Sequence, residues 1–160
     1  MSQESLSSSA QRFQDALQDL GFSLQVVELP DSTRTALEAA EAIGVQVGQI
    51  VKSLVFKTKR SGRPILVVAS GAHRVNEKRI ETRIDEPLGK ASADFVREST
   101  GFSIGGVPPV GHQVHLQTFV DQELLQYEEI WAAAGTPHAV FRLTPSQLIQ
   151  MTQGEVISVQ

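Results

Sequence analysis

The sequence predicts a single domain of mixed α/β (α+β) class, spanning residues 1–160, with a largely antiparallel sheet. Segments of helical and of strand periodicity are interspersed along the chain without strict alternation. Several pairs of strand-like segments are joined by short polar turns that contain glycine, which is the pattern of a β-hairpin. The chain also has no internal repeat and no linker, and its length is typical of one domain with a real core.

The composition restricts the possible classes of protein. The chain is 41% hydrophobic and 20% charged, as expected for a soluble globular domain, and no apolar run approaches the roughly 18 residues of a membrane span. The polar N-terminus lacks a signal-peptide pattern and there is no cysteine, so we expect a cytoplasmic protein without disulfides. Because the formal net charge is −4, any nucleic-acid partner must be bound locally, through a small basic patch.

In the first half of the chain, apolar spacing and turn residues define the expected elements. Apolar residues at spacings of four, three, four and three form a helical stripe that ends before Gly21, and Pro30 interrupts the next apolar segment. The expected elements are a helix over 6–20, a strand over 23–29, a helix from a cap at Ser32 or Thr33 to Gly44, a helical turn over 45–49, and hairpin strands over 50–58 and 64–70.

The second half is defined mainly by capping residues and by alternation. Ser92 and Thr144 are N-cap candidates, and Pro145 suits the first helical position. The expected elements are a short helix from Asn76, a helix from Ser92 to Gly101, a strand over 115–120, a turn or short helix over 121–126, strands over 129–134 and 139–143, a helix from Thr144 to Gly154, and an edge strand over 155–159.

One stretch, residues 101–112, has an unusual composition. It reads Gly-Phe-Ser-Ile-Gly-Gly-Val-Pro-Pro-Val-Gly-His and holds four glycines and two adjacent prolines. Glycine allows close approach to the main chain, and proline stiffens it. The stretch is therefore either a plain connector or a binding platform made of backbone amides. Such amides bind carbonyl, carboxylate or phosphate oxygens.

Two polar side chains occupy positions that suggest a site. Lys52 lies just inside the start of the strand expected over 50–58, next to Val51, where its side chain either extends to solvent or meets an anionic ligand. His138 lies in the glycine-containing turn over 134–138, where it either closes the turn or contacts a ligand. The residues alone leave both alternatives open.

Conventional catalytic motifs are absent from the sequence. The four histidines are His73, His112, His115 and His138, and no carboxylate completes a metal-binding set with them. The chain has no Gly-x-Ser-x-Gly elbow, no phosphate-binding P-loop and no dinucleotide fingerprint. We therefore expect neither a metal nor a cofactor, and a site built from amides and one cation.

Three segments together resemble the YbaK/ProX family of aminoacyl-tRNA deacylases, which is related to the editing insertion domain of bacterial prolyl-tRNA synthetase. They are residues 39–56, which include Ile-Val-Lys-Ser-Leu-Val-Phe, the stretch over 101–112, and residues 131–148, which include Ala-Ala-Ala-Gly-Thr-Pro-His. The resemblance runs in order from about residue 30 to 150. Each motif alone is weak, and the three in order make a specific signal.

The resemblance implies a function in translation fidelity, the hydrolysis of the ester between a wrong amino acid and the 3′-terminal ribose of a tRNA. It also implies a fold with a strongly curved, mostly antiparallel sheet flanked by helices. The implied partner is the aminoacyl end of a tRNA, with tRNA-Pro expected and prolyl-tRNA synthetase as a further candidate. No membrane is involved, and the oligomeric state is left open.

The resemblance also assigns roles to residues. Lys52 matches a strand lysine that holds the 3′-terminal nucleotide or its phosphate, the glycines of 101–112 match a loop whose backbone faces the ester, and His138 resembles a histidine at the amino-acid pocket. The expected catalytic residues are Lys52, Gly106 and His138. The expected substrate-binding residues are Ser53, Gly105, Val107, Pro108, Gly111, His112, Ala134 and Gly135.

The chain departs from the cysteine-specific members of that family. Those tend to carry Ser-Gly-Gly-Lys-Arg-Gly where this chain has Ala-Ala-Gly-Thr-Pro-His at 133–138, so we expect a small apolar or hydroxylated amino acid instead. An aminoacyl ester is already activated, and a positioned water with amide donors suffices to cleave it. Two alternatives remain: a non-catalytic module that binds an aminoacyl or nucleotide end or regulates a synthetase, and a hydrolase of another activated acyl ester.

Overall fold

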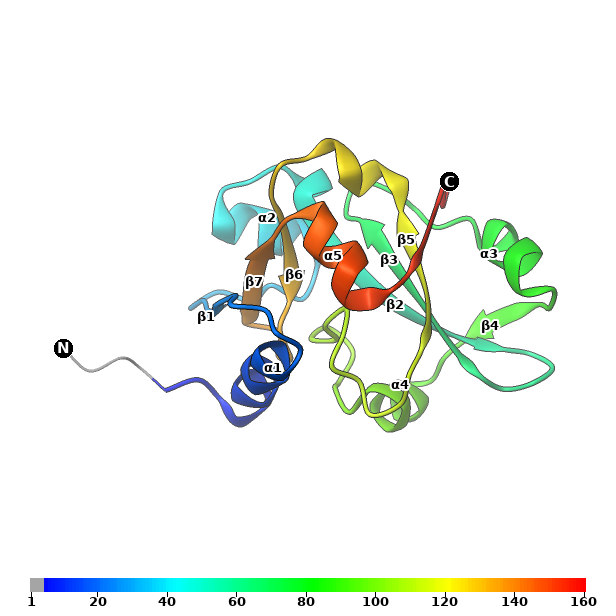
Figure 1. Cartoon of the computed structure of the whole chain (residues 1–160), viewed down its shortest axis with the longest axis horizontal. Coiled ribbons are helices and arrows are strands. Elements are labelled where there is room, and N and C mark those ends of the chain that lie inside the picture. The colour runs from blue at the N-terminus through cyan, green and yellow to red at the C-terminus, as the bar shows by residue number, and fades with distance from the viewer. Residues whose placement is uncertain (1–4) are drawn as a thin grey trace.

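A mixed, open sheet forms the centre of the computed structural model, which describes residues 5–160 (Figure 1). The mixed α/β class predicted from the sequence is confirmed. Within the described residues the strands are β1 (Val26–Glu28), β2 (Ile50–Thr58), β3 (Pro64–Ser70), β4 (Leu88–Lys90), β5 (Gln117–Asp121), β6 (Ile130–Ala133), β7 (Ala139–Leu143) and β8 (Glu155–Ile157).

The strand order is β1-β7-β6-β2-β3-β5-β8, and β4 pairs with β2 beside this path. Four pairings are antiparallel, including the predicted hairpin of β2 and β3. Three are parallel, namely β2 with β6, β3 with β5, and β5 with β8. The parallel pairing of β3 with β5 brings together segments about fifty residues apart, which matters for the site below.

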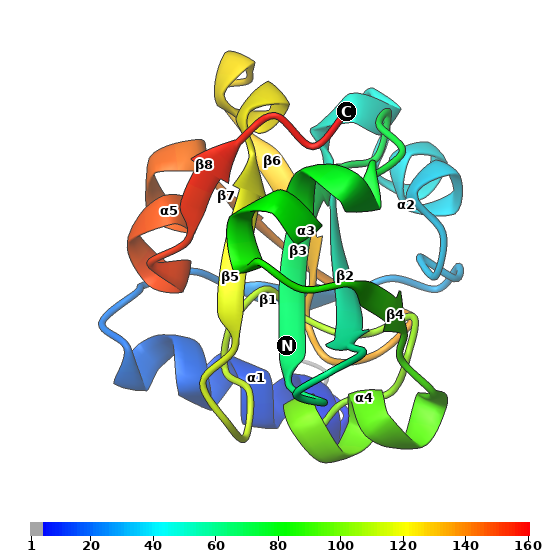
Figure 2. The same ribbon diagram turned by 90° about the vertical axis from the view of Figure 1, so that its right-hand side faces the viewer.

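Helices cover both faces of the sheet (Figures 1 and 2). In β3, Leu66 and Val68 pack into the large core that α1 and α5 complete, whereas Ile65 and Val67 pack against α3 on the other face. This two-sided burial explains why β3 is an uninterrupted apolar run. The helices are α1 (Ser8–Asp19), α2 (Ala36–Ile43), α3 (Glu77–Ile84), α4 (Ala93–Thr100) and α5 (Pro145–Thr152), with 3₁₀ helices η1 (Val47–Gln49) and η2 (Gln122–Gln126). None of the helices in residues 5–160 is long and apolar enough to cross a membrane.

Within residues 5–160, part of β2 has no neighbouring strand on one side. This strand pairs with β6 only through Ile50 and Val51 and with β4 only over 56–58. The Gly71 N–H donates to the Ile50 carbonyl at 2.7 Å and the Thr58 N–H to the Arg63 carbonyl at 3.0 Å. Backbone N–H and C=O groups alternate in direction along a strand. Those of the even-numbered residues of β2 therefore point toward β3, and those of residue 53 point toward the open side. The sheet therefore exposes a short stretch of strand edge.

Three details of the predicted elements are wrong. The N-cap of α2 is Thr35, whose hydroxyl accepts the Glu38 N–H at 3.1 Å, because the Thr33 hydroxyl instead donates to the Pro137 carbonyl at 2.8 Å. Strand β4 was not predicted, since its three residues have no periodicity of their own. The first strand is shorter than 23–29 because the Gln14 side chain takes up the Leu24 carbonyl and the Val26 N–H.

Candidate active site

A cavity of about 510 Å³ opens beside the unpaired edge of β2. Its walls come from α2 and the segment before it, from β2, from the β4–α4 connection, from the 101–112 loop and from β6. Most of the exposed surface within it is apolar. The lining residues include Arg34, Ala36, Lys52, Ser53, Val55, Lys90, Val96, Ile104, Gly105, Val107, Trp131 and Ala133. A mostly apolar cavity with a few convergent polar groups is the usual form of a small-ligand site.

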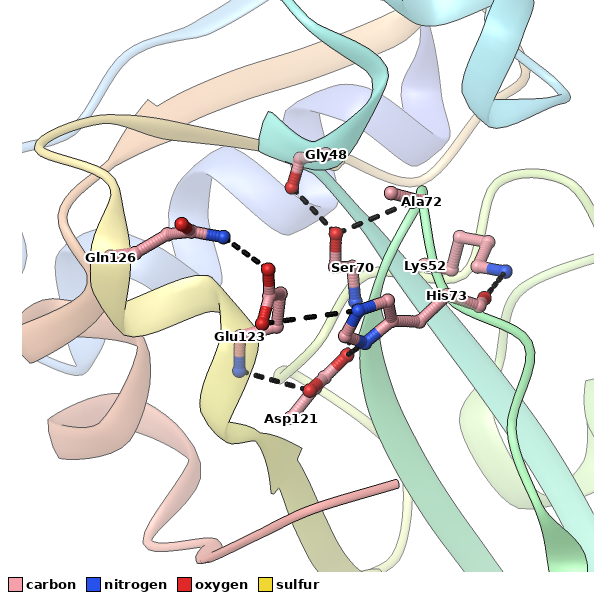
Figure 3. Close-up of polar contacts among 8 residues, drawn as sticks. All are labelled: Gly48, Lys52, Ser70, Ala72, His73, Asp121, Glu123 and Gln126. Carbon is pink, nitrogen blue, oxygen red and sulfur yellow. Dashed lines mark hydrogen bonds and ion pairs between the residues drawn. The ribbon is translucent and has the colours of Figure 1, made fainter. Parts of the chain in front are cut away.

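Lys52 lines this cavity and brings a cationic side chain to it. Its ammonium donates to the His73 carbonyl at 2.7 Å, and the side chain is partly buried (Figure 3). Burial lowers the pKa of Lys52 below its ordinary value, the Asp121 carboxylate acts in the opposite direction, and the Arg74 guanidinium lowers it further. A partly desolvated ammonium interacts more strongly with an anion than one in bulk water.

Ser53 presents a hydroxyl that lacks a partner. Its Oγ is buried and forms no hydrogen bond with any group in residues 5–160. The peptide groups of Ser53 also face the open edge of β2, and the residue lines the cavity. A buried hydroxyl without a partner costs stability, so such groups call for an explanation. A polar ligand group in the cavity would provide the missing partner.

The 101–112 loop contributes backbone amides. The Gly106 N–H donates to the Ser103 carbonyl at 3.0 Å, and Gly105 between them has a φ of 93°, as in a type II turn. Within residues 5–160, the N–H groups of Gly105 and Val107 donate no hydrogen bond, and both residues line the cavity. These two amides are therefore available to a ligand.

Gly106 occupies a different position from the one expected of a catalytic amide. Its N–H is used by Ser103, and its carbonyl accepts the Gly135 N–H at 2.9 Å. A Cβ at residue 106 would lie 2.8 Å from the Cα and N of Thr136. Gly106 is buried and does not line the cavity. Its place is thus the joint at which the 101–112 loop meets the 134–138 turn, and the free amides belong to its neighbours.

The rest of the loop packs inward rather than toward the cavity. His112 Nε2 donates to the Pro108 carbonyl at 2.7 Å, which closes the loop's second half. Burial lowers the pKa of His112, so its ring is neutral at pH 7 and carries its proton on Nε2. Gly111 has a φ of 83° and lies against Phe13 of α1. None of Pro108, Gly111 and His112 lines the cavity, so the structure gives them a supporting position.

The 134–138 turn also lies beside the cavity without lining it. Ala134 is fully buried, and Gly135 packs so closely on α1 that a Cβ would lie 2.8 Å from the Ser9 carbonyl oxygen. The His138 side chain is exposed, with Nδ1 3.2 Å from the Asp31 carbonyl oxygen. Of the predicted site residues, the structure thus brings Lys52, Ser53, Gly105 and Val107 together in one cavity, and it places His138 outside it.

Comparison with known proteins decides the family. Residues 30–151 match the model of the aminoacyl-tRNA editing domain. The chain belongs to the aminoacyl-tRNA editing domain family. The fold of this editing domain superposes with a TM-score of 0.92 on the crystal structure of a proposed trans-editing enzyme for prolyl tRNA synthetase, at 51% identity over 98% of this chain and 99% of the other.

Two relatives of this editing domain differ in how much of their length they share with it. A proposed Cys-tRNA(Pro)/Cys-tRNA(Cys) deacylase, EbsC of Enterococcus faecalis, is 25% identical over 78% of this chain and 76% of its own. A proline–tRNA ligase of Bacillus licheniformis is 35% identical over 61% of this chain but only 17% of its own length. The ligase therefore shares one region with the editing domain and not its whole architecture.

Several residues at the editing domain's cavity were missed in the sequence. Arg34 lines it from the segment before α2, Lys90 from β4, and Trp131 from β6. Behind Lys52 lie His73 and the buried Asp121, joined at 3.0 Å (Figure 3). A carboxylate at the end of the apolar strand β5 was a usable signal, because buried carboxylates are rare unless they are paired. Nothing local to Arg34 or Lys90 pointed to the cavity.

Proposed function

We propose that this chain is a trans-acting aminoacyl-tRNA deacylase that hydrolyses the ester of a mischarged tRNA. The observation that carries the proposal is that Lys52, Ser53 with its unpartnered hydroxyl, and Gly105 and Val107 with their free amides all line one mostly apolar cavity. Membership of the aminoacyl-tRNA editing domain family supports the choice of substrate. We take tRNA-Pro as the preferred tRNA, since a relative at 51% identity is described for prolyl tRNA synthetase. The reaction then belongs to the cytoplasm, where tRNA is charged.

The residues suit a reaction without a protein nucleophile. In the proposed step a water attacks the ester carbonyl carbon, and the carbonyl oxygen becomes an oxyanion to which the Gly105 and Val107 amides donate. The bond between that carbon and the ribose oxygen then breaks, the ribose oxygen takes a proton, and a free amino acid and intact tRNA leave. One oxyanion donor contributes about 3 kcal/mol to such a step. Lys52 binds the 3′-terminal phosphate, and the vicinal ribose hydroxyl assists proton transfer.

The preferred amino acid is small in this proposal. Alanine side chains contribute to the wall near β6, and Val107 of the 101–112 loop adds a further apolar side chain to the lining. A single methylene group discriminates by only about 1–3 kcal/mol in an apolar pocket. We therefore expect several small amino acids to be removed at graded rates, with no sharp preference for cysteine.

A deacylation assay tests the proposal. The panel is tRNA-Pro charged with alanine, serine, threonine, cysteine and proline, and at least one small non-cognate ester should be cleaved well above its spontaneous rate while Pro-tRNA-Pro survives. Lys52→Met keeps the length of the side chain and removes its charge, and should reduce cleavage strongly. Lys78→Met, in an exposed part of α3, is the matched control and should match the wild type. Cleavage of no ester above the spontaneous rate would leave a binding module as the better interpretation.

A further inference from the structure

Behind Lys52 lies a polar cluster that none of the proposed chemical steps uses (Figure 3). Asp121, at the end of β5, is only 1% exposed, and both oxygens of its carboxylate accept hydrogen bonds. Oδ2 accepts the Ser70 N–H at 3.0 Å and His73 Nδ1–H at 3.0 Å, and Oδ1 accepts the Glu123 N–H at 3.0 Å. Three donors on one buried carboxylate make a rigid anchor.

The imidazole of His73 is the link between this anchor and Lys52. The residue follows β3, and its N–H donates to the Ser70 carbonyl at 3.0 Å while its ring is fixed by Asp121. Its own carbonyl accepts the Lys52 ammonium at 2.7 Å. On the far side of the ring, Glu123 Oε2 lies 3.9 Å from Nε2. The side chain of His73 therefore fixes the carbonyl that holds the lysine.

We propose that His73, clamped by Asp121, is a positioning residue that holds the Lys52 ammonium at the edge of the cavity. A lysine side chain is a flexible four-carbon stem that ends in a compact charge. Neighbouring groups therefore have to fix the direction in which the ammonium points. The carbonyl of His73 takes one ammonium donor and leaves two for a substrate oxygen. The inference rests on the proposed function for its catalytic consequence, but the positioning itself is measurable without any substrate.

The charges around Lys52 set the direction of the expected effects. Asp121 of β5 favours the ammonium form, and Arg74, from the segment after β3, disfavours it. Asp121→Asn keeps the shape of the side chain and removes its negative charge, so a larger share of Lys52 is the free amine at a given pH. His73→Ala removes the clamp and frees the carbonyl. His73→Asn restores an N–H donor at the same number of bonds from the backbone as Nδ1, so it should act as the conservative rescue.

Acylation of Lys52 by acetic anhydride, followed by peptide mass spectrometry at one mildly alkaline pH, tests the positioning directly. Lys52 should react severalfold faster in Asp121→Asn and His73→Ala than in the wild type, and at the wild-type rate in His73→Asn. His115→Ala, which changes an exposed histidine outside the cluster, is the matched control. In the deacylation assay the first two variants should lose about tenfold in kcat/KM, or about 1.4 kcal/mol, with His73→Asn close to the wild type.

The two assays separate the two proposals. An unchanged acylation rate of Lys52 in folded Asp121→Asn and His73→Ala overturns the positioning, whatever the deacylation results are. Faster acylation in a protein that cleaves no ester supports the positioning and removes the proposed function instead. Circular dichroism and thermal melting show which variants fold. If Asp121→Asn does not fold, the comparison of His73→Ala with His73→Asn still tests the positioning. If His73 were only structural, the acylation rate of Lys52 would not depend on whether residue 73 carries an N–H donor.

Discussion

At the scale of the residue, the Ser53 hydroxyl is expected to lower the stability of the fold and to strengthen substrate binding. Its buried Oγ has no partner in residues 5–160, and an unsatisfied hydroxyl typically costs about 1–3 kcal/mol. We expect Ser53→Ala to raise the free energy of unfolding by about 1 kcal/mol, measured by urea denaturation. The same variant should raise KM for an aminoacyl-tRNA, because the substrate loses a hydrogen-bonding partner. Ser23→Ala, at an exposed position, should change neither quantity. A less stable Ser53→Ala variant would show that the hydroxyl has a partner in solution.

At the scale of the element, the contact between the 101–112 loop and the 134–138 turn depends on Gly106. A Cβ there would lie 2.8 Å from the Thr136 backbone, which has no flexible end to move aside. We expect Gly106→Ala to lower the free energy of unfolding by about 1–3 kcal/mol and to reduce deacylation by displacing Gly105 and Val107. Gly89→Ala is the matched control, since its Cβ would meet the flexible Lys59 side chain at 3.4 Å and the Lys57 carbonyl oxygen at 3.5 Å, which are ordinary contact distances. Equal stability of the two variants would contradict a tight joint.

Elements with local signals were predictable from the sequence, and elements without them were not. The bounds of β2, β3 and β7 agree with prediction because continuous apolar runs end at clear turn residues, and the caps Ser92 and Thr144 accept the expected N–H groups. Strand β4 exists only because β2 offers it a partner, so its three residues show no pattern. The packing of the 101–112 loop and of the 134–138 turn likewise depends on contacts with α1, which is far away in the sequence.

In the candidate site, too, some features have local sequence signals and others depend on distant contacts. Lys52 was singled out because a charged residue interrupts an apolar run, the loop because of its glycines, and Ser53 only through the family resemblance. Their roles as site residues stay predictions. Within that loop the Gly106 N–H is taken up locally by the Ser103 carbonyl, whereas the Gly106 carbonyl bonds to Gly135, which is far along the chain. The pair of His73 and Asp121, 48 residues apart, meets only because β3 and β5 are parallel neighbours. Local sequence patterns do not encode such a pairing.

At the scale of the whole molecule, the net charge of −4 has to be reconciled with a polyanionic substrate. In the turn between β2 and β3, Arg60 donates to the Asp85 carbonyl and Arg63 pairs with Glu86 at 3.7 Å. Lys57, Lys59 and Lys90 have no acidic partner within residues 5–160, and Lys90 lines the cavity. Strand pairing places Lys90 opposite Phe56 and Lys57 opposite Gly89. Part of the unpaired positive charge therefore lies where β4 meets the cavity.

This placement predicts a shallow dependence of tRNA binding on salt. With only two or three phosphates neutralised, log KM should rise with log salt at a slope of roughly 2, whereas kcat should stay constant. Lys59→Ala and Lys90→Ala should each raise KM and lower that slope by about 1, and Lys78→Ala should do neither. With a short aminoacyl oligonucleotide that ends before the acceptor stem, KM should no longer respond to Lys59→Ala but should still respond to Lys90→Ala. Of these two lysines, Lys90 lines the cavity and Lys59 does not. A slope as steep in the double variant as in the wild type would place the tRNA on another face, for example over the arginines of α3.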